Sequence, residues 1–144
     1  MAAPAYTWEF NCDLFGDRIP KVVTLEAASG LYTKVGTLVS MSSGQVAATT
    51  DGTGSTVIGI AMEEISNATA ADPVKVAMIA PGMVIKGTAV DSAASTSGFT
   101  SKAQDLDADG RLDPDDVTGG GLTTWRTEDS GLTVYCLVCS GAII

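Results

Sequence analysis

Short apolar segments, each ended by glycine or a small polar turn, follow one another through residues 35–87. They lie at 36–39, 57–61, 74–79 and 82–85. Brief runs of β-branched and aliphatic residues between turn residues are typical of strands in a small barrel or sandwich with short hairpins. Hardly any of these residues carries a group that can do chemistry. The run therefore predicts a rigid surface rather than a catalytic centre.

The flanking sequence extends this all-β prediction. We expect strands at 22–25 and 31–35, and again at 122–126 and 132–138. No stretch of about a dozen residues has the periodicity of an amphipathic helix, and 63–71 has room for one helical turn at most. We expect a single β domain over 21–144, an extended N-terminal arm over 1–20, and a long acidic loop excursion over 88–121.

Composition limits the classes of partner. The chain has 144 residues, enough for one domain without a disulfide or metal. Charged residues make up 17%, below the usual quarter, so either neighbouring subunits cover part of the surface or the surface is rich in Ser, Thr and Ala. The net charge is −9, from 8 basic and 17 acidic residues. This balance argues against binding to nucleic acid or to an anionic membrane.

Targeting signals are not evident in the sequence. No segment approaches the roughly 20 apolar residues of a membrane helix. Residues 1–6 lack the basic and apolar regions of a signal peptide. We expect the chain to be made in the cytoplasm, and to be used there or carried out as part of a particle.

An aromatic stripe stands near the N-terminus. Tyr6, Trp8 and Phe10 alternate with Thr7 and Glu9, so an extended chain would place the three rings on one face. Two interpretations are open. The stripe is the first strand of the β domain, or it is an arm that lies on a neighbouring subunit, where aromatic side chains are favoured anchors.

The cysteines and the lack of histidine bear on catalysis. Cys12, Cys136 and Cys139 are an odd number, which argues against a disulfide framework. A zinc site at the CxxC would need more ligands than the chain offers. In a strand, residues three apart point to opposite faces, so we expect free thiols, at least one of them in the core. Without histidine the usual base is missing, and we expect no enzymatic activity.

The segment 105–116 resembles the calcium loop of dockerin modules. Its oxygen-bearing residues fall at the first, third, fifth, ninth and twelfth positions, Gly110 permits the sharp bend, and the Arg111 carbonyl is available. The alternative is an acidic surface turn in which Asp113 caps one helical turn begun by Pro114. Calcium is thus a candidate ligand. The candidate ligand set is Asp105, Asp107, Asp109, Arg111, Asp113 and Asp116.

The order and spacing of the β segments resembles the small decoration, or cement, proteins that stabilise the heads of tailed bacteriophages. The resemblance covers most of the chain beyond residue 20 and does not include the acidic loop. It rests on segments 36–39, 44–46, 57–61, 71–76, 82–84, 121–126 and 132–138.

The resemblance implies a β-barrel-like or β-tulip domain that is commonly a homotrimer. Such a protein is made in the bacterial host and binds the outside of the capsid at three-fold or quasi-three-fold positions. There it cements neighbouring major capsid proteins, and we expect Tyr6, Trp8 and Phe10 to make contacts. The alternative function is a calcium-stabilised β module of a fibre, adhesin or other extracellular assembly.

Overall fold

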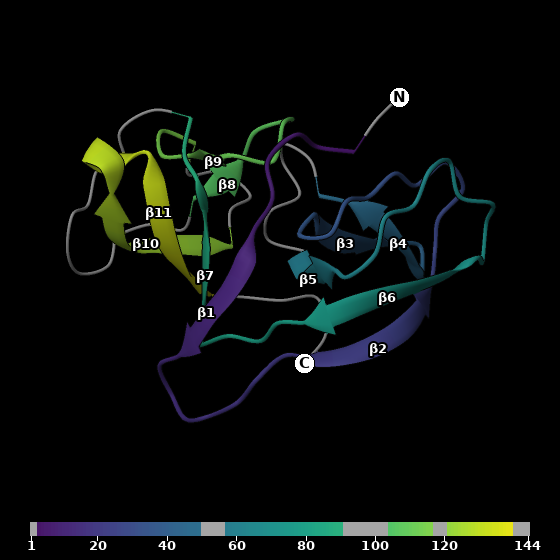
Figure 1. Cartoon of the computed structure of the whole chain (residues 1–144), viewed down its shortest axis with the longest axis horizontal. Coiled ribbons are helices and arrows are strands. Elements are labelled where there is room, and N and C mark those ends of the chain that lie inside the picture. The colour runs from purple at the N-terminus through teal and green to yellow at the C-terminus, as the bar shows by residue number, and fades with distance from the viewer. Residues whose placement is uncertain (1–2, 50–56, 91–103, 117–120, 140–144) are drawn as a thin grey trace.

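A computed structural model describes residues 3–49, 57–90, 104–116 and 121–139. Within these residues the chain forms strands, short turns and a single 3-10 turn, η2 (Asp129–Gly131), and no helix there is long and apolar enough to span a membrane (Figure 1). The strands are β1 (Glu9–Asp13), β2 (Lys21–Glu26), β3 (Leu38–Ser42), β4 (Gln45–Ala48), β5 (Val57–Ala61), β6 (Pro73–Met78), β7 (Met83–Thr88), β8 (Asp105–Leu106), β9 (Leu112–Asp113), β10 (Leu122–Glu128) and β11 (Thr133–Val138).

Two antiparallel sheets and a hairpin make up the architecture. The four-stranded sheet has the order β1-β7-β11-β10, the five-stranded sheet has the order β2-β6-β5-β3-β4, and β8 pairs with β9. A parallel bridge between Ala27 and Val46 brings the two edges of the five-stranded sheet together at one point. Neither sheet closes into a barrel in the described part of the chain. The all-β prediction with short hairpins is therefore confirmed.

The first core lies between the two sheets. Ile85, Val134 and Cys136 face inward from the four-stranded sheet and meet Leu38 and Ile60 of the five-stranded sheet. The inward residues of β11 alternate along the strand, as expected where one face of a sheet is buried. Leu106 and Leu112 bring the β8–β9 hairpin into the same core.

The second core lies on the opposite face of the five-stranded sheet. Its strand residues are covered by the connections that leave β2 and β5, through Leu31 and Ala68. The carbonyl of Ala68 accepts a hydrogen bond from the backbone of Gly30 at 2.8 Å, which ties the two connections together. The strand residues of this core are Val39, Val46, Ile58, Ala61, Val74 and Val76.

β5 is buried on both faces. Val57 and Ile60 contribute to the first core, while Ile58 and Ala61 contribute to the second. This double burial explains why the segment is apolar throughout rather than alternating. Gly59 is required by a close approach, because a Cβ there would lie 2.5 Å from the Ala77 carbonyl oxygen.

The segment 31–35, predicted as a strand, does not form one. Thr33 instead exchanges two backbone hydrogen bonds with Ile65, at 3.0 and 3.1 Å, in an isolated bridge. Pairing at a single residue satisfies the backbone of both connections without adding a strand to either sheet. Of the predicted loop excursion, residues 91–103 and 117–120 lie outside the described residues.

Candidate interaction surface

Part of the predicted N-terminal arm is a strand of the domain itself. β1 pairs antiparallel with β7, with Phe10 opposite Ile85 and Asp13 opposite Met83. Residues 9–13 therefore agree with the interpretation of the aromatic stripe as a strand of the β domain.

Trp8 is 3% exposed and packs in the first core, where its Nε1 donates a 2.7 Å hydrogen bond to the Gly110 carbonyl. The ring occupies the space beside Gly87, where a Cβ would come within 2.3 Å of it. The folded chain already covers this ring and leaves little of it open to a partner, and the predicted partner contact of Trp8 stays a prediction. Tyr6 is partly exposed, with Arg111 at 5.0 Å from its ring, and Phe10 is half-buried. Their predicted contacts stay predictions.

The predicted calcium loop is a β-hairpin in which Arg111 pairs with the aspartates nearest to it. Asp107 accepts backbone hydrogen bonds from Asp109 and Arg111, at 3.0 and 2.8 Å, and forms a 2.9 Å ion pair with the Arg111 guanidinium. Asp109 lies 3.6 Å from the same guanidinium. The Arg111 carbonyl accepts a hydrogen bond from the Asp107 backbone, so the hairpin already uses this oxygen.

The other predicted ligands do not converge on a common point. Asp105 is buried in β8, opposite Asp113 of β9. The Asp113 carboxylate accepts a hydrogen bond from the Asp115 backbone at 3.2 Å, which agrees with the capped turn, although no helical turn follows. Across the described ranges, no three acidic, cysteine or histidine side chains are arranged to hold a metal ion. This arrangement does not favour the six-residue calcium set, which stays a prediction.

The three cysteines are free thiols. Cys136 is fully buried in the first core, and burial raises the pKa of its thiol. Cys139 is exposed, with its sulfur 2.6 Å from the Thr123 hydroxyl. The opposite orientation expected of the CxxC pair is confirmed.

Residues 14–19, in the connection between β1 and β2, are here called the corner loop. A charged clamp holds its shape: Arg18 donates to Asp13 through Nε at 2.6 Å and through its terminal nitrogen at 3.0 Å. Asp13 also accepts the backbone N–H of Phe15, and Arg18 reaches the Pro81 carbonyl at 2.8 Å. The hydrogen bond from the Arg18 side chain lowers the pKa of Asp13 from 3.8 to about 2. The clamp thus fixes the loop in one conformation.

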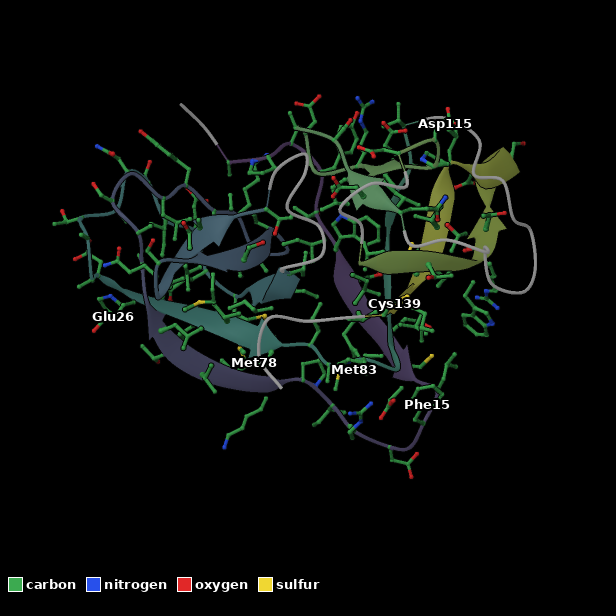
Figure 2. The ribbon with its side chains drawn as sticks, turned by 180° about the vertical axis from the view of Figure 1, so that it is seen from behind. Phe15, Glu26, Met78, Met83, Asp115 and Cys139 are labelled. Atoms are coloured by element: carbon green, nitrogen blue, oxygen red, sulfur yellow. The ribbon has the colours of Figure 1, made fainter. Side chains whose placement is uncertain are left out.

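The clamped corner loop presents apolar side chains outward. Phe15 is 76% exposed and Ile19 is 77% exposed, and Leu14 is also exposed. Figure 2 shows Phe15 at the outer end of the connection, beyond Met83. Large apolar side chains this open on a rigid loop are unusual unless a partner covers them.

An apolar groove of about 300 Å³ adjoins the corner loop. It runs between the start of the four-stranded sheet and the edge of the five-stranded sheet, with Ile60 and Ala77 in its lining. Its more exposed walls are Phe10, Pro20, Val22, Val35 and Met62. Pro20 follows Ile19 directly, so the groove and the corner loop form one continuous surface, here called the apolar corner.

The groove exists because one sheet has fewer strands than the other. Val22, Ala77 and Ile60 lie in one row across β2, β6 and β5. The four-stranded sheet covers this row at Ile60, which is buried, and ends at β1 before it reaches Val22, which is 50% exposed. The edge strand β2 therefore carries apolar side chains that the chain's own fold does not cover.

Sequence reasoning missed the apolar corner. The available signal was a cluster of large apolar residues, Leu14, Phe15 and Ile19, in a segment whose Gly, Asp and Pro residues mark it as a turn. A turn segment has no need of such side chains for its own folding.

No protein-family model matches the chain, and no curated protein matches it.

Proposed function

We propose that this chain is a structural protein of a tailed-bacteriophage virion that binds the outside of the capsid. It acts as a homotrimer and cements neighbouring major capsid proteins. In this proposal the two sheets correspond to the barrel-like or β-tulip domain of the decoration proteins that the sequence resembles. The chain works by adhesion and has no catalytic role.

The apolar corner is the observation that carries this proposal. Phe15 and Ile19 are large side chains whose backbone is already fixed by the Asp13–Arg18 clamp. A loop held in its bound shape loses little conformational entropy on docking, so its contacts contribute more fully to affinity. Anchors of this kind, seated in a pocket of the partner, dominate the energy of protein interfaces.

The size of the corner suits a contact that is repeated. A standard interface has about 20–30 residues on each side, more than the six residues of the corner loop and the ten that line the groove. Three copies of a modest contact, linked in one trimer, bind a lattice far more strongly than one copy does. The net charge of −9 fits a place on the outer face of a shell, away from packaged DNA.

Co-sedimentation with purified capsid shells of the corresponding phage tests the proposal, with light scattering of the free protein to count subunits. We expect a trimer in solution and saturable binding in multiples of three copies per site. A protein that stays in the supernatant at every shell concentration would contradict the proposal.

A further inference from the structure

A second cluster of interface-type side chains lies on the outer face of the four-stranded sheet. Along β11, Val134 and Cys136 point into the first core, so Tyr135 between them lies on the other face of the sheet, where neighbouring side chains leave it 5% exposed. Arg126 of β10 lies directly opposite Tyr135. The pairing of these strands skips Trp125, which is a bulge residue. Bulges re-aim side chains and are common next to functional sites.

The bulge allows two rings to contact one guanidinium. The Arg126 guanidinium carbon lies 4.3 Å from the centre of the Tyr135 ring and 5.5 Å from that of Trp125. The Tyr135 hydroxyl donates a hydrogen bond to Glu128, and the Lys86 ammonium lies 5.5 Å from the centre of the Tyr135 ring. These contacts hold Tyr135 in place. The rings of Trp125 and Tyr135, rather than a carboxylate, orient the Arg126 guanidinium.

Arg126 retains its donors for a partner. In the parts of the chain that the structure describes, no carboxylate lies within ion-pair distance of Arg126, whereas Arg18 and Arg111 each pair with an aspartate. A guanidinium presents a planar fork of N–H groups that matches a carboxylate with two parallel hydrogen bonds. Trp, Tyr and Arg are also the residues most enriched among the energetic anchors of interfaces.

We propose that Arg126, held in position by the rings of Trp125 and Tyr135, binds the acidic turn after β9, at Asp115, of a second copy of this chain. Charge complementarity favours this occupant. Asp115 is exposed on the turn, and its carboxylate has no partner among the described residues of its own chain (Figure 2). A contact between two different surfaces is head-to-tail, and such contacts close into a ring when the rotation between neighbouring subunits allows closure. The proposal rests on the homotrimer of the proposed function and gives it a specific contact.

Charge reversal tests this contact in solution, without capsid shells. Sedimentation velocity over a range of protein concentrations would compare the wild type with Arg126→Glu, Asp115→Arg and the double variant. Each single variant should need at least about tenfold more protein to associate, because a like-charge pair replaces a complementary one. The double variant should associate as the wild type does. Arg126→Lys should be intermediate, since it keeps the charge and loses the planar fork.

Matched variants separate the contact from net charge. Lys21→Glu and Glu26→Arg make the same charge changes at exposed positions of β2, and Figure 2 shows Glu26 on the far side of the molecule from Asp115. Both should associate as the wild type does. Equal weakening in these controls, no weakening in Arg126→Glu, or no recovery in the double variant would overturn the proposal.

The outcomes distinguish this inference from the proposed function. If Arg126→Glu still forms the wild-type oligomer but fails to co-sediment with shells, Arg126 contacts the capsid, and the self-contact is overturned. If charge reversal and recovery behave as expected but no variant binds shells, the self-contact stands and the capsid function fails.

Discussion

β5 and β2 belong to the same sheet, yet they differ in how far their side chains are buried. β5 is covered on both faces, by the four-stranded sheet on one side and by the connections after β2 and β5 on the other. β2 lies at the edge, and its Val22 is half exposed although Val22 and Ile60 stand in one row. The extent of the opposing sheet therefore decides which valines and isoleucines are buried and which are exposed.

This contrast divides the molecule into a stabilising part and a binding part. Side chains of β5 gain their full burial energy when the single chain folds. Side chains of the apolar corner remain in water until a partner covers them. A substitution in β5 should therefore mainly lower stability, whereas a substitution in the apolar corner should mainly weaken binding to a partner.

The largest effect on stability is expected at β5. Ile58→Ala removes a buried side chain of the second core and should lower the free energy of unfolding by about 2–5 kcal/mol. Val22→Ala in β2 should cost less than about 1 kcal/mol, because half of that side chain is in water already. Urea unfolding at neutral pH measures both. Equal losses would show that β2 is covered after all.

A smaller loss is expected where β1 joins the domain. Trp8→Phe keeps most of the ring but leaves the Gly110 carbonyl without the indole donor. An unsatisfied buried carbonyl costs about 1–3 kcal/mol. Thermal unfolding should show the loss, with Tyr6→Phe as the control, since its ring is partly exposed and no hydrogen bond of its hydroxyl is seen among the described residues. A neutral Trp8→Phe would mean that the indole contact does not hold β1 to the hairpin.

Sequence patterns located the elements whose signals are local. The strands β5, β6, β7, β10 and β11 were predicted within a few residues, because apolar runs between turn residues mark them. β1 was left undecided between strand and arm, since its partner β7 is distant in the sequence and no local pattern specifies that pairing. The prediction at 31–35 failed because a local apolar pattern cannot show whether a sheet has an edge available.

The site was less predictable than the fold, for two reasons. The calcium motif counts oxygens at fixed positions, but it does not register that Arg111 folds back on Asp107 and supplies the positive charge itself. The apolar corner depends on the mismatch between four strands and five, which follows from long-range pairing. Burial of Trp8 likewise depends on Gly87 and Gly110, both far away in the sequence.

The clamp of the corner loop should respond to acid. Because the pKa of Asp13 is lowered to about 2 when folded, the unfolded chain binds the extra proton first. The contribution of the clamp is present above the ordinary pKa of 3.8 and is lost as the pH falls toward 2. The difference in unfolding free energy between the wild type and Asp13→Asn should therefore shrink over this range. A difference that is constant with pH would contradict the clamp.

The smallest effect on stability is expected at the apolar corner. Phe15→Ser and Ile19→Ser replace exposed side chains and should change the free energy of unfolding by less than about 0.5 kcal/mol. The same urea experiment measures this effect. A loss as large as that of Ile58→Ala would show that these side chains are part of the core.

Binding of these same variants to capsid shells tests whether the apolar corner is the capsid contact. The double variant Phe15→Ser/Ile19→Ser should lose at least about tenfold in affinity for shells in quantitative co-sedimentation, while its stability stays at the wild-type level. Leu132→Ser, which removes an exposed apolar side chain elsewhere, should bind as the wild type does. Wild-type binding by the double variant would contradict the assignment of the apolar corner as the capsid contact.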